Sequence, residues 1–264
     1  MPICGVHISA CIITLNEETN IRDCLESIRW VDEIVVVDAL SSDETRAICR
    51  EYTDKVVERP WEGHIAQKNY ALSLATHEWV LCIDADERVS ADLRDEIHRE
   101  MEDTTRTWDG YYFPRQTFYL GRWIRHGGWY PDYKLRLFRK TKGRWAGVDP
   151  HDVVQLDGRA KYLRSPLYHY TYRDIAHHLR EMNQYTDIAA TQKERAQATF
   201  PLAHMLLNPI VKFVRMYIVK RGFLDGIPGF IIAVCGSFYV FLKYAKLWEL
   251  RHGGRTRPVT AGGR

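Results

Sequence analysis

The segment from Trp79 to Ile83 is a short apolar run that leads directly into two acids, Asp84 and Asp86. Such a run predicts a strand buried on both faces of a sheet, and ligands of open α/β sheets collect beyond the carboxyl ends of these strands. Two carboxylates one residue apart can share a Mg²⁺ or Mn²⁺ ion with waters and phosphate oxygens. The same acids could instead cap the next helix, so the surrounding pattern has to decide.

The first half of the chain alternates strand and helix patterns, which predicts an α/β fold with a mostly parallel sheet covered on both faces. A capping-box pattern at Ser41 and Glu44 is expected to open one of the helices. Three of the strands end near Asn16, Asp38 and Asp84, and in a doubly wound sheet such ends converge. Strands are expected at 8–14, 34–37, 56–57 and 79–83, and helices at 20–28, 64–75 and from about 90 to 101.

The second half of the chain differs from the first in its residue composition and pattern. Residues 110–172 are aromatic and β-rich with glycine and proline turns, which predicts a smaller antiparallel extension. Residues 174–196 are polar and helical, and residues 200–250 are apolar, aromatic and basic. We therefore expect a catalytic domain over 1–172, a helical, membrane-associating region over 173–250 and a flexible basic tail over 251–264.

Charge is divided unevenly along the 264 residues. Residues 1–199 hold 27 lysines and arginines against 32 acids, whereas residues 200–264 hold 10 against 2. A mildly acidic body argues against nucleic acid as a partner, and a basic, apolar tail suits an anionic membrane surface. The six cysteines show no zinc spacing, and no secretory leader is evident, so we expect reduced thiols and a body on the cytoplasmic side.

The longest uncharged run, residues 226–242, has 17 residues and lies at the lower edge of the length that spans a bilayer. We favour a re-entrant or interfacial segment over a spanning helix. Lys212, Arg215, Lys220 and Arg221 alternate with aromatic and aliphatic residues, as in a helix that lies in a headgroup layer. The alternative is a surface helix packed on the body.

The sequence has no G-x-G-x-x-G after its first strand, no P-loop and no G-x-S-x-G elbow. Its acids instead follow strands, in three segments that occur in order: 12–17 (IITLNE), 33–45 (EIVVVDALSSDET) and 84–86 (DAD). Together these segments resemble a family 2 glycosyltransferase with the GT-A fold, over about residues 7–172. The segments 136–139 (RLFR) and 221–226 (RGFLDG) are similar to the WaaE-like lipopolysaccharide core β-glucosyltransferases, which act on lipid-linked saccharides at the inner membrane.

The resemblance implies a role for each matching residue. Asp86, with help from Asp84, would hold the metal, and the mechanism would be inverting, with direct displacement of UDP by the acceptor hydroxyl. The base is expected in the segment 149–152 (DPHD), where we favour Asp152 over Asp149, although both acids could simply cap a turn. The residues implied in nucleotide-sugar binding are Thr14, Asn16, Glu17, Asp38, Lys68 and Asp84.

The acceptor site is the least specified part of the prediction. Trp129 and Tyr130 could stack on an acceptor sugar, and Arg136 and Arg139 could grip phosphates; a core position for the aromatics and a surface position for the arginines are the alternatives. The chain also departs from the family pattern, because Asp38 is followed by Ala39 and Leu40 where a second acid or serine and a glycine are usual. This departure puts nucleotide contact at that turn in question.

The predicted function is transfer of one hexose, glucose in its most specific form, from a UDP-sugar to a lipid-linked saccharide such as the lipopolysaccharide inner core. The enzyme would use Mg²⁺ or Mn²⁺ and lie at the cytoplasmic face of the bacterial inner membrane, as a peripheral or monotopic protein. Transfer to polyprenyl phosphate and a non-catalytic membrane adaptor are the alternatives. Intact Asp86 and Asp152 argue against the adaptor.

Overall fold

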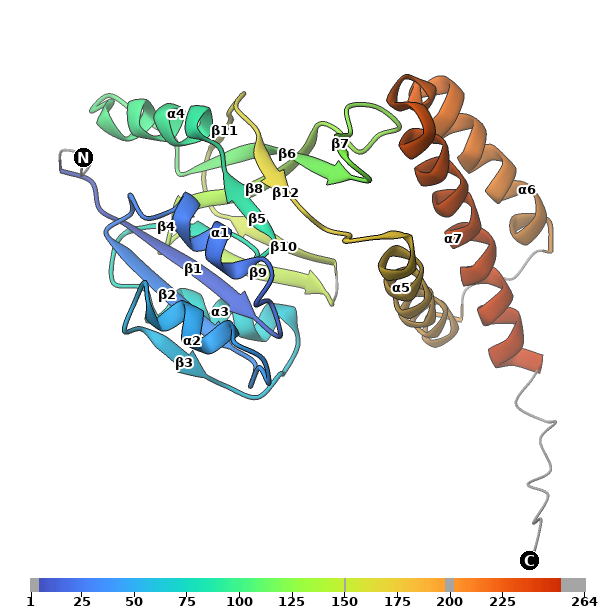
Figure 1. Cartoon of the computed structure of the whole chain (residues 1–264), viewed down its shortest axis with the longest axis horizontal. Coiled ribbons are helices and arrows are strands. Elements are labelled where there is room, and N and C mark those ends of the chain that lie inside the picture. The colour runs from blue at the N-terminus through green and yellow to red at the C-terminus, as the bar shows by residue number, and fades with distance from the viewer. Residues whose placement is uncertain (1–4, 150, 198–201, 253–264) are drawn as a thin grey trace, which may run out of the picture. The chain divides into compact units, whose positions relative to one another are not determined.

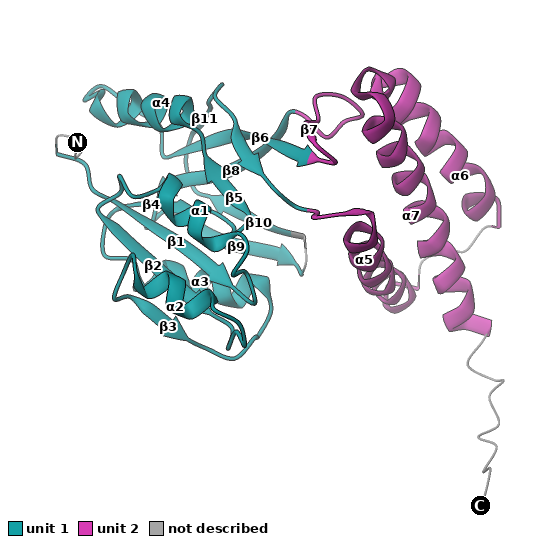
Figure 2. Cartoon of the chain, viewed as in Figure 1, with its two compact units in different colours: residues 1–118, 131–171 teal, residues 119–130, 172–264 magenta. Residues whose placement is uncertain are grey.

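The computed structural model describes residues 5–149, 151–197 and 202–252, which fall into two compact units. One unit comprises residues 1–118 and 131–171, and the other residues 119–130 and 172–264 (Figure 2). The predicted boundary at 172 falls where the second unit resumes, but the segment 119–130 also groups with the helical part. The predicted tail lies outside the described residues from 253 onward.

The first unit is built on a large mixed sheet (Figure 1). Its strands run in the order β3-β2-β1-β4-β8-β6-β12-β5, and the first four of these pair in parallel. β4 then pairs antiparallel with β8, and β8 with β6. The strands of this sheet that belong to the unit are β1 (Ile8–Thr14), β2 (Glu33–Asp38), β3 (Val56–Glu58), β4 (Trp79–Cys82), β5 (Glu87–Val89), β6 (Gly110–Tyr119), β8 (Asp132–Arg139), β11 (Ala160–Tyr162) and β12 (Leu167–His169).

Helices cover both faces of this sheet because its central strands are apolar on both sides. Alternate residues of β1 show this: Ile8, Ala10 and Ile12 pack with one set of helices, whereas Cys11 packs on the opposite face. The first face carries α1 (Ile21–Ser27), α2 (Thr45–Arg50) and α4 (Ala91–Glu102). The second carries α3 (His64–Leu74) and the antiparallel pair β9 (Gly143–Val148) and β10 (His151–Leu156). The α/β fold with a parallel core and a small antiparallel extension is therefore confirmed.

One helix start was predicted wrongly. α2 begins at Thr45, and its N-cap position Glu44 makes no side-chain capping bond. The Ser41 hydroxyl donates instead to Asp38 at 2.5 Å. A buried carboxylate at the end of β2 outcompetes the backbone N–H groups of the next helix for this side chain.

The second unit is helical. It contains α5 (Ile175–Arg195), α6 (Leu202–Val214), the π-helical turn η1 (Arg215–Val219), the 3₁₀ turn η2 (Gly222–Asp225), α7 (Gly226–His252) and the short strand β7 (Arg122–Trp123). α7 packs against both α5 and α6. By length and composition alone, the segments Leu202–Val219 and Gly222–His252 could each cross a membrane.

Candidate active site

The carboxyl ends of β1, β2 and β4 lie side by side, since β1 pairs in parallel with both of the other strands. The residues that follow these strands therefore gather at one edge of the sheet, as the sequence predicted. Asp38 ends β2, Asn16 follows β1 and Asp84 follows β4.

Asp38 is fully buried and organises the first two of these loops. Its carboxylate accepts hydrogen bonds from the Thr14 hydroxyl at 2.8 Å and from the backbone N–H of Ser41 at 2.8 Å. Because these bonds come from the chain itself, a buried carboxylate is satisfied without a ligand. Asp38 thus fixes the shape of the loop, and a nucleobase would have to use the acceptor capacity that remains.

The loops after β1 and β2 are also tied to each other. The Asn16 side-chain oxygen accepts from the N–H of Ser42 at 2.8 Å, and the N–H of Glu17 donates to the Thr45 hydroxyl at 2.8 Å. Leu40, at the position where the family usually has glycine, adopts a φ of 63° with its side chain 52% exposed. The left-handed turn therefore forms without glycine, at the conformational cost that an L side chain carries there.

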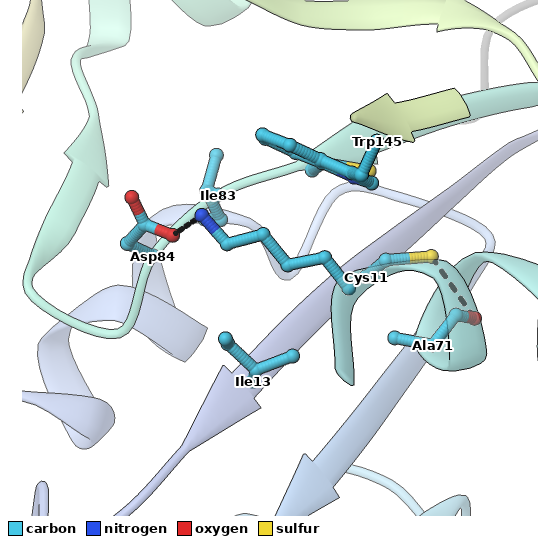
Figure 3. Close-up of a pocket in the computed structure, with 8 residues that line it drawn as sticks. Cys11, Ile13, Ala71, Ile83, Asp84 and Trp145 are labelled. Atoms are coloured by element: carbon cyan, nitrogen blue, oxygen red, sulfur yellow. Dashed lines mark hydrogen bonds and ion pairs between the residues drawn. The ribbon is translucent and has the colours of Figure 1, made fainter. Parts of the chain in front are cut away.

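A compact charge cluster lies beyond β4, and Figure 3 shows its ion pair between Asp84 and a lysine nitrogen. The Lys68 ammonium, on α3, is 2.8 Å from Asp84 and 2.8 Å from Asp152 on β10. Arg136, on β8, is 2.5 Å from the other oxygen of Asp84 and 2.7 Å from Glu87. Lys68 also lies over the Trp145 ring, with its nitrogen 4.4 Å from the ring centroid. Residues of α3, β8, β9 and β10 thus meet beside the turn that follows β4.

The two cations hold this cluster in its charged state. Burial by itself would raise the pKa of Asp84, but Arg136 and Lys68 outweigh it and keep that pKa well below the ordinary value of 3.8. Burial would also lower the pKa of Lys68, yet the attraction of Asp84 and Asp152 raises it above 10.5. Asp84 and Lys68 therefore stay ionised across the neutral range.

Asp86 faces a different partner, His169, at the end of β12. His169 Nε2 is 3.0 Å from the Asp86 carboxylate, and its Nδ1 is 3.4 Å from the Thr117 hydroxyl. Burial would raise the pKa of Asp86, but the His169 ring outweighs it, so the pKa lies below 3.8. His169 was not among the predicted site residues, because no motif spacing connects the last residue of a late strand with the acids after β4.

Glu87, which follows directly on the acid pair, was also not among the predicted site residues. Its fully buried carboxylate accepts from the backbone N–H of Asp84 at 3.0 Å and pairs with Arg136 and with Arg115 at 3.3 Å. Glu87 therefore sets the turn that presents Asp84 and Asp86. Its position within the acidic run was the one feature of the sequence that could have pointed to it.

The donor atoms fit a divalent cation better at Asp86 than at Asp84. Both oxygens of Asp84 are already in ion pairs, with Lys68 and with Arg136. Asp86 and His169 instead present a carboxylate oxygen and an imidazole nitrogen to each other. Carboxylate oxygens suit Mg²⁺ and Mn²⁺, and imidazole is a ligand of divalent transition metals. No cluster of three or more histidine, cysteine or acidic ligands occurs among the described residues. A metal ion bound by Asp86 and His169 would therefore need further oxygen atoms, from a bound substrate, to complete its coordination shell.

The structure separates the two acids that were candidates for the base. Asp149 accepts from the backbone N–H of Ile65 at 3.1 Å, in the first turn of α3, where an acid is favoured by the unpaired N–H groups. Asp152 instead joins Lys68 in the charge cluster. The turn residue Pro150 lies outside the described residues.

The four predicted acceptor residues are divided between the two units. Arg136 is buried in the charge cluster, but Arg139 lies opposite Trp79, at the other end of β4, where it pairs with Glu78 and is 3.6 Å from Asp109. Trp129 and Tyr130 belong to the helical unit. There Trp129 packs in an aromatic cluster, with its ring 5.7 Å from Tyr119 and 6.3 Å from both Tyr172 and His178.

A small cavity of about 10 Å³ borders the charge cluster on its apolar side. Ile13 and Cys11 of β1 line it together with Ala71, and Asp84 and Trp145 flank the lysine nitrogen (Figure 3). The apolar walls exclude water from one side of the ion pairs, which strengthens their attraction. The open side of Asp84, whose side chain is 28% exposed, is where a ligand can reach the cluster.

This fold, with acids gathered at one edge of its sheet, is that of a glycosyltransferase of the GT-A type. The family described as Glycosyl transferase family 2 matches residues 9–167, and the chain belongs to it. It is similar, with 30% identity over 258 residues and 95% of both chains, to the lipopolysaccharide core biosynthesis glycosyltransferase LpsC of Rhizobium meliloti (strain 1021). It is also 30% identical over 255 residues, 92% of this chain and 90% of the other, to an uncharacterized glycosyltransferase of Rickettsia conorii.

A solved structure shows the same fold. The mannosyltransferase PcManGT from Pyrobaculum calidifontis, solved in complex with GDP-Man and Mn²⁺, aligns with a TM-score of 0.55 at 15% identity. The alignment covers 94% of this chain and 89% of that one. The GT-A fold expected from the motifs is therefore confirmed.

Proposed function

We propose that this glycosyltransferase moves a single hexose, most specifically glucose, from a UDP-sugar to a lipid-linked saccharide such as the lipopolysaccharide inner core. The similarity to LpsC over 95% of both chains supports the acceptor class. The observation that carries the chemistry is the cluster in which Lys68 bridges Asp84 and Asp152 at the ligand edge of the sheet.

In this proposal the donor nucleotide lies over the loops that Asp38 organises. Thr14, Asn16 and Glu17 shape the pocket through their bonds to the β2 loop, and Asp38 offers its remaining acceptor capacity to the base. The diphosphate then points toward Lys68, the cation nearest to Asp84 on the α3 side. Phosphate oxygens are good partners for such a buried ammonium.

Asp86 and His169 would hold a Mg²⁺ or Mn²⁺ ion, with Asp84 nearby. The ion would neutralise charge that develops on the departing UDP. Arg136, held by Asp84 and Glu87, adds fixed positive charge on the same side. The chain thus supplies cations where the leaving group needs them.

Asp152 is our candidate for the general base. It would accept the proton of the acceptor hydroxyl as that oxygen forms a bond to the anomeric carbon and the bond from that carbon to the diphosphate oxygen breaks. One displacement inverts the anomeric centre. Lys68 fixes the orientation of Asp152 through its 2.8 Å contact. Trp129 and Tyr130 stay our proposal for stacking on the acceptor sugar, and Arg136 and Arg139 for phosphate contacts.

We also propose that α6, η1 and α7 attach the protein to the cytoplasmic face of the inner membrane, in a peripheral or monotopic manner. The Lys212 side chain of α6 packs beside Gly236 of α7. Its Cε lies 3.8 Å from the position that a Cβ atom would occupy at Gly236. Gly236 is close to the middle of the uncharged run 226–242. A charge at the bilayer centre costs about 2.5–3.5 kcal/mol or more, which favours an interfacial position over a spanning one.

The test is a UDP-release assay with a panel of UDP-sugars, lipid extract as acceptor, and Mn²⁺ or Mg²⁺ present or absent. We expect release that needs one donor, the extract and the metal, and that is lost in Asp152→Asn. Asp149→Asn is the matched control, because this acid bonds α3 and should leave more of the activity. Absence of release with every donor, together with absence of UDP binding, would refute the proposal.

A further inference from the structure

A groove of about 340 Å³ runs between α6 and α7 within the helical unit. Met205, Pro209 and Phe213 of α6 line it from one side, and Val234 and Phe238 of α7 from the other. This volume lies in the range of about 300–1,000 Å³ that is typical of small-molecule sites. The lining is apolar except for a single hydroxyl.

That hydroxyl belongs to Ser237, and it already makes a hydrogen bond within the protein. Ser237 Oγ donates to the backbone carbonyl of Pro209 at 2.6 Å, which ties the two helices together at the groove. Near one end, the Phe213 ring meets Tyr217 at 5.4 Å and Phe230 at 6.0 Å. These contacts join the two helices along the groove, and its lining presents mainly hydrocarbon to any molecule that enters it.

A cation stands at the rim of this groove. Lys212 precedes the lining residue Phe213, and its stem lies against α7 at Gly236. Lys212 is exposed, and the charged groups that act on it are the cations Arg215 and Lys220; none of the ion pairs among the described residues includes it. Lysine places its apolar stem on a hydrophobic surface and its charge in the polar layer above, and this geometry suits a headgroup that carries a phosphate.

The charges around the groove favour an anionic lipid over a protein surface as the molecule that binds there. Residues 202–252 contain only two acids, Asp225 and Glu249. Asp225 is 1% exposed and accepts hydrogen bonds from the backbone N–H groups of Arg125 and His126 at 3.1 and 2.7 Å. The exposed surface of α6 and the following turns is therefore apolar and cationic, which complements a molecule with a long apolar chain and an anionic head.

We propose that the groove between α6 and α7 binds one acyl chain of an anionic lipid, with the lipid phosphate at Lys212. The inference rests on the proposed membrane association but not on the transferase chemistry. It assigns to the groove a chain seated between two helices, in addition to the general contact that any interfacial helix makes with a bilayer.

The experiment uses the full chain with vesicles of phosphatidylglycerol that contain an analogue with a diazirine in its acyl chain. After irradiation, peptide mass spectrometry maps the adducts. We expect label to concentrate on Met205, Phe213 and Phe238. Val211 and Ile227, which are 63% and 76% exposed but do not line the groove, should carry less. Label distributed in proportion to exposure would overturn the proposal.

Two variants fill the groove from opposite helices, Ser237→Trp and Met205→Trp, and each should abolish the concentration of label there while Val211→Trp leaves it unchanged. Lys212→Gln should weaken labelling by phosphatidylglycerol by about fivefold, the factor for one lysine at an anionic surface, and not by phosphatidylcholine. Circular dichroism establishes that each variant is folded. Groove residues cross-linked to a second copy instead of lipid would also contradict the proposal. Asp152→Asn should label normally, so this result is independent of the transferase test.

Discussion

Lys68→Met offers the most direct test of the charge cluster. Methionine keeps an unbranched apolar stem as long as lysine up to Cε but removes the ammonium that lies 2.8 Å from both Asp84 and Asp152. Lys68 is 8% exposed, and the Asp152 side chain is 11% exposed. Removal of one partner from such a buried ion pair costs about 3–5 kcal/mol, because the remaining charge has no compensation.

The expected loss lies at the lower end of this range. Asp84 keeps Arg136 at 2.5 Å, so its charge remains compensated. Asp152 keeps no ion-pair partner among the side chains that the structure describes. We therefore expect a loss of about 3 kcal/mol in the free energy of unfolding at neutral pH, the value for one uncompensated carboxylate in a partly open site. Lys134→Met is the matched control, since Lys134 is 39% exposed on a surface pair with Asp132 and should cost at most about 1 kcal/mol.

The difference between wild type and Lys68→Met should depend on pH. The depressed pKa of Asp84 means that its stabilisation is present above about pH 3.9 and is lost as the pH falls through its folded value. The raised pKa of Lys68 means that its stabilisation is present below about pH 10.4 and is lost as the pH rises through its folded value. Urea unfolding followed by tryptophan fluorescence at several pH values measures this. Equal losses in the two variants, or a loss in Lys68→Met that does not diminish as the pH is lowered below about 3.9, would refute the reasoning.

Four further predictions concern single contacts. Asp152→Asn should lower kcat by about 10²–10⁴-fold and leave UDP affinity nearly unchanged, which separates a base from a binding residue in steady-state assays. His169→Gln should weaken Mn²⁺-dependent UDP binding by at least about tenfold in calorimetry, while metal-free binding stays the same. Thr14→Val removes a donor to buried Asp38 and should cost about 1–3 kcal/mol in urea unfolding. Changing Lys220 and Arg221 together to Gln should weaken flotation with phosphatidylglycerol vesicles by about 30-fold, and an unchanged affinity would argue against an interfacial role.

The sequence predicted a helix or strand correctly where the spacing of apolar residues and a turn residue at its end indicated the same bounds. β1 has the predicted bounds, Ile8–Thr14, and α3 begins at the predicted residue, His64. These elements are specified by which face of each strand or helix is apolar, and neighbours in the chain carry that information. The start of α2 was wrong because Ser41 bonds a buried residue of the preceding strand, and a pattern of caps does not record such competition.

The order of the strand ends was also within reach of the sequence. Parallel strands joined by helices bring their carboxyl ends to one edge, so the acids after β2 and β4 could be assigned to one site from their positions alone. The resemblance to the family then suggested Lys68 and Asp152. The spacing of these residues along the chain does not predict that the Lys68 ammonium lies between the Asp84 and Asp152 carboxylates.

The tertiary structure decided which side chains form ion pairs with the site acids. Asp84 is paired with cations from α3 and β8, and Asp86 with a histidine from β12, so two acids one residue apart have different chemical surroundings. It also separated Arg136 from Arg139, which lie near opposite ends of β4 although they are three residues apart. The sequence by itself thus determined the fold class and the edge at which the acids gather, since periodicity and strand order are local properties. The identity of each ion pair depends on contacts between distant segments, and only the folded chain brings those segments within a few ångströms of each other.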